Sequence, residues 1–433
     1  MRFGVATAGF QIEGGYNGDA QPANNWAGWE AAGRAARSGA ALDFWNDFET
    51  HLDRVRDLGC TAFRLSVEWA RCEPRRDEWD ATAFDRYARI LDACRARGLE
   101  PLVTLHHFTH PAWLPVDFWL TPDAPERFAA WVDVVVERLS GGCSNWVTLN
   151  EINVYALQTY LTGEFPPGRR LSIRRVVRCL DNMLAAHVLA YDAVKRVQPN
   201  ATVTTNNYCF SIYELDRLLL DVLLARSHGI ERHDLGPWLA GRRTTYHASV
   251  RPPSAIERFL RRRARSALPL DKALPRAAAA VYDSPHARTL DVIAIDHYLP
   301  AIADHARVRN RGLWGDRPAP GELIRYRRLN HEAGLPVWVV ENGLCSRDHA
   351  ARADGWDRPR YIREHLDAVR TAVDKGIPVE AYFHWTLADN YEWGSYAPRF
   401  GLFAVDQPDG AWSDTGAMGD DAAGAFRDAI AAW

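Results

Sequence analysis

The sequence lacks the features of a secreted, disulfide-bonded or membrane-spanning protein. Its seven cysteines are an odd number, and they form no short paired spacings. No apolar run approaches the length that crosses a bilayer, and Met1 leads directly into an expected strand rather than a charged and then apolar leader. We therefore expect a cytoplasmic protein in which Cys60, Cys94 and Cys179 are buried free thiols.

The chain also lacks a strong net charge. The formal charge is −3 over 433 residues, so no global field favours binding to nucleic acid or to a membrane surface. One local basic cluster, without interleaved aromatic residues, is best interpreted as a solvated helix face, with a nucleic-acid contact as the alternative. The cluster consists of Arg258, Arg261, Arg262, Arg263 and Arg265.

Eight short apolar stretches alternate with segments in which apolar residues recur every three or four positions. Such stretches are typical of strands buried on both faces of a parallel sheet, and eight of them favour a closed (β/α)8 TIM barrel with extended βα loops. We expect one catalytic barrel domain over residues 1–433. The predicted strands are 2–8, 61–66, 102–107, 145–151, 201–206, 290–296, 336–341 and 378–385, and the predicted helices are 42–58, 84–94, 128–139, 182–197 and 362–369.

Two of the predicted strands end in a glutamate, Glu151 and Glu341. Because burying a carboxylate inside a strand costs several kcal/mol, each side chain should lie at the strand's end and face a polar cavity. The carboxyl ends of barrel strands meet at one face, so the two glutamates should face one substrate. One such glutamate alone is equally compatible with a structural salt bridge, but two facing carboxylates are the machinery of glycoside hydrolysis.

Other polar and aromatic side chains follow the ends of the remaining predicted strands, except the fifth. They would form a ring of hydrogen-bonding groups with two aromatic platforms, which suits a sugar ring with a polar edge and an apolar face. Arg64 beside Glu341 should lower the pKa of that carboxyl and keep it ionised, whereas Glu151 has no nearby cation in the sequence and should have the higher pKa. The set is Gln11, Arg64, His107, Asn150, Glu151, Tyr298, Glu341, Trp385, Glu392 and Trp393.

Six motifs in order along the chain carry a family resemblance, and they lie at residues 6–14, 63–69, 104–108, 148–151, 340–343 and 385–393. Together they resemble glycoside hydrolase family 1, the β-glucosidase and β-glycosidase family, nearly from end to end. Residues 163–168 are similar to those of archaeal-type members. The resemblance implies a β-glucosidase-like retaining enzyme that hydrolyses the terminal non-reducing β-D-glycosyl residue of an unphosphorylated glycoside.

The resemblance also implies roles for single residues. Glu151 would be the acid/base, Glu341 the nucleophile, and Tyr298 a hydrogen-bond donor to the nucleophile. The sugar hydroxyls would be bound by Gln11, His107, Asn150, Glu392 and Trp393, with Trp385 under the sugar face. No metal or cofactor is expected. The expected partner is a small-molecule β-glycoside or short oligosaccharide, neither nucleic acid nor membrane, and a homo-oligomer is left open.

Several positions depart from the family pattern. Ile152 stands where proline usually follows the acid/base, and Asp296-His297-Tyr298 replaces an Asn-aromatic-Tyr motif. We expect Asp296 to bring an extra carboxylate near the site that shifts its pKa values. The segment from Trp393 to Arg399 is one residue short, and the usual basic and serine signature after Asp406 is missing. These departures leave the natural aglycone and the exact sugar open.

Three other functions fit parts of the sequence. A transglycosidase would use the same two glutamates and differ only in the acceptor. A metal-dependent hydrolase would need His106, His107 and His110, but neighbouring strand residues point to opposite faces, so the first two cannot both be ligands. A sugar-binding protein without catalysis would be expected to lose one glutamate, and both are present.

Overall fold

Nine parallel strands form one sheet at the centre of the molecule. The computed structural model describes residues 1–433 except 211, 250–271, 273, 299–317, 325–332 and 407–409. The strands of the sheet are β1 (Arg2–Ala6), β2 (Ala62–Ser66), β3 (Glu100–Thr104), β4 (Asn145–Val147), β5 (Thr202–Thr204), β6 (Asn206–Tyr208), β7 (Ile293–Asp296), β8 (Val337–Asn342) and β10 (Val379–Trp385).

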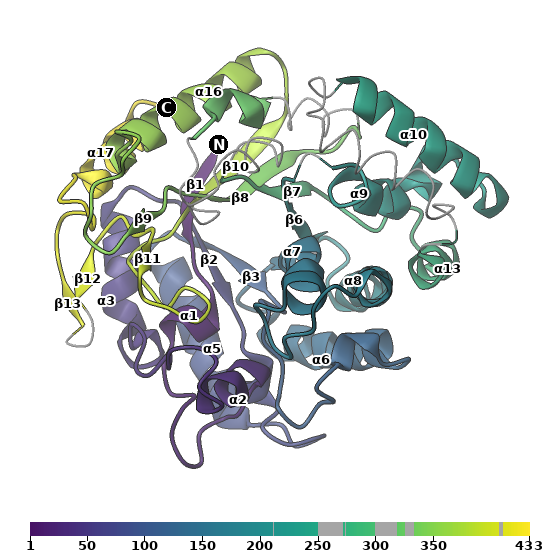
Figure 1. The fold of residues 1–433 in the computed structure, drawn as a ribbon, viewed down its shortest axis with the longest axis horizontal. Helices are drawn as coiled ribbons and strands as arrows, with labels where there is room; N and C mark the ends of the chain where they lie inside the picture. Colours follow the sequence, from purple (N-terminus) through teal and green to yellow (C-terminus); the bar gives the residue numbers. More distant parts are fainter. Residues whose placement is uncertain (211, 250–271, 273, 299–317, 325–332, 407–409) are drawn as a thin grey trace.

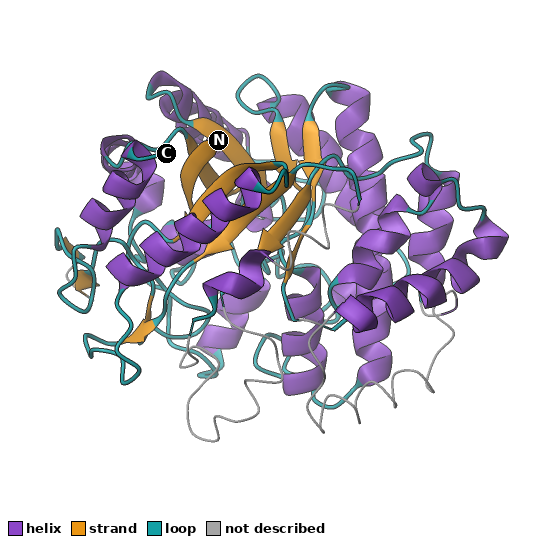
Figure 2. Cartoon of the chain, turned by 90° about the horizontal axis from the view of Figure 1, so that it is seen from above, coloured by secondary structure: helices purple, strands orange, loops and turns teal. Residues whose placement is uncertain are grey.

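The order of these strands gives a nearly closed barrel, β5-β4-β3-β2-β1-β10-β8-β7-β6. The two strands at the ends of this order, β5 and β6, are separated only by Thr205, so the chain itself joins the two edges. The predicted fifth strand is therefore present but broken in two, and the eight predicted strands become nine. The TIM barrel predicted from the sequence is confirmed, and Figures 1 and 2 show its strands at the centre with helices around them.

The barrel strands are buried because helices cover their outer face and side chains fill the interior. Every residue of β2 and β8 is buried, as expected for parallel strands without polar alternation. The register of strand pairing also determines which residues of the site lie side by side at the same height of the barrel. Ala6 pairs with both Arg64 and Trp385, and Asp296 pairs with Glu341 across a register shift.

The helices around the barrel bury one apolar face each, which stabilises them against the sheet. Helix α5 begins at the Asp80 cap, where Oδ1 accepts from Thr82 N at 2.8 Å, and Gly59 ends α3 with φ of +81°. The helices near the barrel are α1 (Gly9–Ile12), α2 (Asn25–Ala31), α3 (Phe44–Asp57), α4 (Trp69–Cys72), α5 (Ala81–Ala96), α6 (Ala124–Leu139), α7 (Ile152–Leu157), α8 (Ile173–Val197), α16 (Arg358–Asp374) and α17 (Ala422–Ala431), with the shorter η1 (Phe118–Leu120) and η2 (Gln158–Thr162).

Most predicted boundaries differ from the structure by a few residues, and three of the differences bear on the site. Helix α8 begins at Ile173 rather than at residue 182, because Val176 and Cys179 continue its buried face toward the N-terminus. The third and fourth strands end at Thr104 and Val147, before the predicted 107 and 151. The functional residues of these segments thus lie in the loops beyond the ladder.

The connection between β6 and β7 is the longest extended loop of the barrel. Its helices lie together beside the barrel (Figure 1), and α13 is joined to α8 through Asp181, which accepts from Ala277 N at 2.9 Å. The cluster Arg258–Arg265 lies outside the described residues, so its interpretation as a solvated helix face stays a prediction. These helices are α9 (Arg217–Leu224), η3 (Arg226–His228), η4 (Arg232–Asp234), α10 (Leu235–Ser249) and α13 (Pro275–Asp283).

Two features outside the barrel bear on the expectations above. All seven cysteines are buried and free, in agreement with the expected thiols. Among the described residues, none of the helices has the length and apolar character needed to cross a membrane. Two small antiparallel sheets complete the fold, one of β9 (Ser346–Arg347) with β11 (Pro398–Arg399) and one of β12 (Val405–Asp406) with β13 (Ala411–Trp412).

Candidate active site

A pocket of about 200 Å³ opens at the carboxyl ends of the barrel strands. This is the end at which the active sites of such barrels lie. The pocket has carboxylates at its base and mainly aromatic walls. It is lined by His107, Phe108, Glu151, Val154, Gln158, Glu164, Phe165, Tyr208, Phe210, Tyr298, Glu341, Trp385, Glu392, Trp393, Pro398 and Phe400.

Glu341 lies at the end of β8 and is held by two donors. Arg64 Nη1 donates to its Oε1 at 2.5 Å, and the Tyr298 hydroxyl donates to its Oε2 at 2.6 Å. Gly343 follows because β8 approaches β10 closely, and a Cβ there would overlap the carbonyl oxygen of Trp385.

The pKa of Glu341 is set by opposing effects. Burial raises it, while Arg64 and Tyr298 lower it. Arg64 therefore acts in the expected direction, but the net shift is upward. The cause is the complete burial of both side chains, since desolvation disfavours the charged form.

Glu151 lies just beyond β4, at the residue before α7. Its backbone is left-handed, with φ of 38°, a conformation that is uncommon for a residue with a side chain and concentrates at functional sites. Burial raises the pKa of Glu151 well above its ordinary value, and the charges of Asp296 and Glu341 raise it further. Its Oε1 has no hydrogen-bond partner among the described residues. The neighbouring negative charges therefore favour the protonated form of Glu151, whereas Arg64 and Tyr298 favour the ionised form of Glu341.

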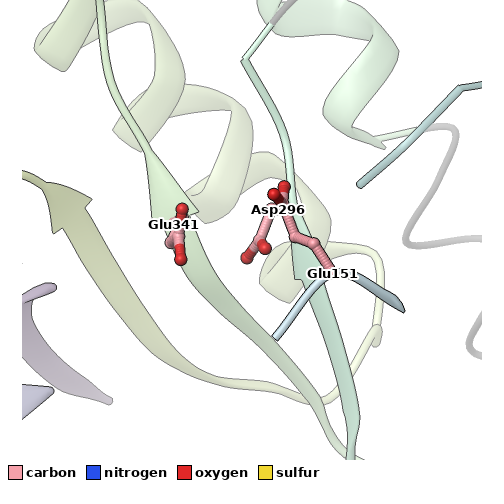
Figure 3. Close-up of side chains that lie close together, drawn as sticks. All are labelled: Glu151, Asp296 and Glu341. Atoms are coloured by element: carbon pink, nitrogen blue, oxygen red, sulfur yellow. The ribbon is translucent and has the colours of Figure 1, made fainter. Parts of the chain in front are cut away.

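Asp296, at the end of β7, brings a third carboxyl to the two glutamates. One oxygen from each of Glu151, Asp296 and Glu341 lies within 4.8 Å of the others. Figure 3 shows Glu151 and Asp296 close together, with Glu341 facing them from the adjacent strand. Among the described residues this is the one group of three or more His, Cys, Asp or Glu side chains close enough to hold a cation, and it contains none of the three histidines considered above.

The fifth strand contributes to the site, so the expectation that it would not is wrong. Asn206, the first residue of β6, donates through Nδ2 to Asn150 Oδ1 at 2.9 Å and also to Asp296 Oδ2. Tyr208, at the end of β6, lines the pocket. Both were missed because the run Thr202–Asn206 is polar and ends without a charged residue.

The Asn150 side chain is fixed by its neighbours in the same network. Arg64 Nη2 donates to Asn150 Oδ1 at 2.5 Å, so one guanidinium holds both Asn150 and Glu341. The Asn150 Nδ2 atom has no partner among the described residues. Because buried polar atoms are normally hydrogen-bonded, this amide is suited to a ligand hydroxyl.

Glu392 lines the pocket and is supported by the buried Gln11. Gln11, in α1, donates to Glu392 Oε2 at 3.0 Å, and its own Oε1 has no partner among the described residues. Burial and the nearby Glu341 raise the pKa of Glu392 to about 8. The nearby Arg399 forms its ion pair with Asp389, at 3.4 Å, and not with Glu392.

The aromatic platforms predicted from the sequence lie on either side of His107. The His107 ring stacks on Trp385 with a centroid distance of 5.9 Å and on Trp393 with a centroid distance of 5.7 Å. Burial lowers the pKa of His107 well below its ordinary value, so the imidazole is neutral. The neutral ring can donate a hydrogen bond to a ligand hydroxyl through one nitrogen, or accept one through the other.

The mouth of the pocket is more apolar than the sequence indicated. Phe108 and Phe165 contact each other with a centroid distance of 5.1 Å, and Tyr208 and Phe210 with one of 4.8 Å. These residues come from separate segments of the chain, so their common pocket could not be read from spacing alone. Ile152, the departure after Glu151, is fully buried at the start of α7.

Comparisons with known proteins find relatives along most of the chain. The model of glycosyl hydrolase family 1 matches residues 1–248 and 314–415. Beta-glucosidase 47 of Arabidopsis thaliana is 26% identical over 93% of this chain and 80% of its own length. Galactolipid galactosyltransferase SFR2, chloroplastic, of the same plant is 27% identical over 90% of this chain, which spans 58% of that protein. A solved structure of a beta-glucosidase from Thermotoga maritima with castanospermine has the same fold, with a TM-score of 0.78, 22% identity and coverage of 99% of this chain and 97% of that one.

Proposed function

Because this chain belongs to glycosyl hydrolase family 1, we propose that it is a retaining β-glycosidase. The observation that carries the proposal is the short distance between two carboxyls in unlike surroundings. Oxygens of Glu151 and Glu341 lie within 4.8 Å of each other. Carboxyl groups are about 5–5.5 Å apart in retaining enzymes and about 6.5–9.5 Å apart in inverting ones. The separation therefore favours a covalent intermediate over direct attack by water.

In the first step, Glu341 is the nucleophile and Glu151 the acid. A Glu341 oxygen attacks the anomeric carbon while the bond from that carbon to the leaving oxygen breaks. Glu151 gives its proton to the leaving oxygen, so the aglycone departs as an alcohol. Arg64 donates to one carboxylate oxygen of Glu341 and Tyr298 to the other, and together they orient the carboxylate for attack.

In the second step, water releases the sugar. Glu151, now ionised, takes a proton from water, the water oxygen attacks the anomeric carbon, and Glu341 leaves as a carboxylate. The two inversions restore the original anomeric configuration. The different surroundings of the two carboxyls suit these roles, because Glu341 has a cation and a hydroxyl donor whereas Glu151 has neighbouring negative charge.

The sugar that fits the pocket is a neutral β-D-glycoside, with glucose preferred and fucose or galactose tolerated. Glu392 can accept two hydroxyl hydrogens from one sugar edge, and Asn150 Nδ2 and Gln11 Oε1 are free to meet others. In this proposal the hydroxyls are bound by Gln11, His107, Asn150, Glu392 and Trp393, with Trp385 under the sugar face.

A transglycosidase is the second candidate, and two observations favour it. One relative is named a galactolipid galactosyltransferase, and the mouth of the pocket is lined by aromatic rings that would suit an apolar acceptor. The same glycosyl ester on Glu341 would then pass to an alcohol instead of water. Product analysis with and without an added alcohol separates the two.

We also propose that residues 1–433 form one catalytic domain, since α13 of the long β6–β7 connection is hydrogen-bonded to the barrel helix α8. The seven buried free cysteines are compatible with a reducing compartment, and on that basis we propose the cytoplasm.

A screen of nitrophenyl β-glycosides tests the proposed function and the sugar preference together. The expected result is hydrolysis of the β-glucoside, with weaker activity on the β-fucoside and β-galactoside. The Glu341→Ala variant should lose activity on all of them, while Asp192→Asn, which changes a carboxyl bonded to Ser284 away from the pocket, should match the parent enzyme. Absence of activity on every β-glycoside would contradict the proposal.

A further inference from the structure

The proposed reaction needs two carboxyls, but the pocket holds a third. Asp296 is fully buried, and one of its oxygens lies within 4.8 Å of an oxygen of Glu151 and of Glu341. Its Oδ1 has no hydrogen-bond partner among the described residues. The chain departs from its family here, since the resemblance implies asparagine at this position. A buried carboxylate with no evident role in the two-step reaction requires a physical explanation.

The charges around the three carboxyls show that they cannot all ionise together. Arg64, from β2, is the only cation facing them in the described part of the chain, and it is hydrogen-bonded to Glu341. Full ionisation would leave two buried negative charges side by side without a counter-charge, so one proton is retained. The other titratable groups lining the pocket, none of them cationic, are His107, Glu164, Tyr208, Tyr298 and Glu392.

The retained proton belongs to the pair of Glu151 and Asp296. Glu341 has the Arg64 guanidinium and the Tyr298 hydroxyl as donors, so it ionises first. The remaining two carboxyls are close enough to share one proton, as paired carboxyls in other buried sites do. Figure 3 shows these two groups next to each other.

Asn206 decides on which carboxyl the proton stays. Its Nδ2 donates to Asp296 Oδ2, and a hydrogen bond to the charged form favours that form. Its Oδ1 lies 3.5 Å from Arg64 Nη2, which fixes the orientation of the amide. Glu151 has no such amide donor among the described residues, and its Oε1, like Oδ1 of Asp296, has no partner there. The proton is therefore held on Glu151, and Asp296 is the ionised member of the pair.

We propose that Asp296 is a positioning residue that keeps the proton of Glu151 in place, so that Glu151 stays protonated in more alkaline solution than burial alone allows. This inference rests on the proposed function, in which Glu151 is the acid/base. Burial raises the pKa of both carboxyls well above their ordinary values. The Asp296 charge raises the pKa of Glu151 further, whereas the hydrogen bonds from Asn206 and Glu151 lower that of Asp296, which is the order that the geometry gives.

The pairing has a consequence for both steps of the reaction. A carboxyl with higher proton affinity is a weaker acid toward the leaving oxygen but a stronger base toward water. When Glu341 forms the ester it loses its charge, so the site then holds two carboxyls and one guanidinium. Asp296 thus favours the second step, in which Glu151 must take a proton from water.

The pH dependence of kcat/KM on a nitrophenyl β-glucoside tests this inference. Asp296→Asn keeps the shape of the side chain and removes its charge. Asp296→Ser also removes the charge but leaves a smaller polar group. In both variants the alkaline limb should move to lower pH by about one unit or more, since strongly coupled carboxyls differ by at least that much. The Asp192→Asn control, a carboxyl bonded to Ser284 on the far side of α8, should leave the limb where it is.

Three outcomes overturn the inference. The first is an alkaline limb that stays in place or moves upward in either folded variant. The second is a parent enzyme whose own alkaline limb lies below about pH 6, a value that burial alone can give a catalytic glutamate. The third is a parent enzyme without glycosidase activity, which would remove the proposed function as well. If the parent enzyme is active but the alkaline limb does not move in the variants, the inference about Asp296 is wrong and the proposed function stands.

Discussion

The guanidinium of Arg64 donates to Oε1 of Glu341 over 2.5 Å, and both side chains are buried. The same guanidinium holds Asn150 Oδ1 at 2.5 Å. One arginine thus positions the proposed nucleophile and a proposed sugar-binding amide together. The contact also opposes the effect of burial on the pKa of Glu341, so it should set the acidic limit of activity.

Replacing Arg64 should narrow the active pH range from the acidic side. Arg64 lowers the pKa of Glu341, so its removal in Arg64→Met raises that pKa, and the acidic limb of kcat/KM should move up by about one pH unit or more. Arg64→Lys keeps the charge but not the fork that reaches two partners, and should move the limb less. A folded Arg64→Met variant, checked by circular dichroism, with an unmoved acidic limb would show that Arg64 does not control Glu341.

Removing Glu151 should affect substrates according to their leaving groups. Proton assistance is typically worth about 10²–10⁴-fold, and a leaving group that departs easily as its anion needs little of it. The glycosylation step of Glu151→Ala should therefore be much less impaired on a dinitrophenyl glycoside than on an alkyl glycoside. Pre-steady-state kinetics on the two substrates measures this step. Equal losses on both would remove Glu151 from the role of acid.

Much of this site was predictable from the sequence, and the reasons are physical. Glu151 and Glu341 follow predicted strands, and two carboxylates at such positions are expected to face one cavity at the strand ends. The same reasoning failed for Asn206, because Thr202–Asn206 has no apolar run and the break at Thr205 is not visible in the sequence.

Two other properties depend on three-dimensional neighbours rather than on spacing. The pairing of Asp296 with Glu341 depends on the register shift between β7 and β8, which no local pattern reports. The net rise in the pKa of Glu341 depends on how completely Arg64 and the glutamate are buried, and the sequence could show only that a cation was present. The barrel itself was predictable because most of its strands, such as β8, are buried on both faces and mainly apolar.

The binding of a neutral sugar should strengthen as pH rises toward about 8. The pKa of Glu392 is raised to about 8 in the empty pocket, and a ligand whose hydroxyls donate to it binds the ionised form better. Affinity for an uncleaved thioglycoside should therefore rise with pH below this value and level off above it, as measured by calorimetry. Glu392→Gln cannot ionise, so its affinity should not depend on pH in this range. The same pH dependence in both proteins would refute the role given to Glu392.

A 6-phosphate on the sugar should be disfavoured. It brings about two negative charges to the edge that Glu392 would bind, and residues 394–398 supply no lysine to balance them. The preference for nitrophenyl β-glucoside over its 6-phosphate, as a ratio of kcat/KM values, should increase as pH rises through about 8 and Glu392 gains its charge. A preference for the phosphorylated substrate would overturn the proposed sugar specificity.

The most direct test of the account is the anomeric configuration of the first product. Glu151 and Glu341 oxygens within 4.8 Å of each other favour double displacement through an ester on Glu341. Proton NMR during hydrolysis of a β-glucoside should show the β-anomer of glucose first, with the α-anomer appearing only later by mutarotation. Initial release of the α-anomer would mean direct attack by water, and would contradict the proposed nucleophile and the covalent mechanism together.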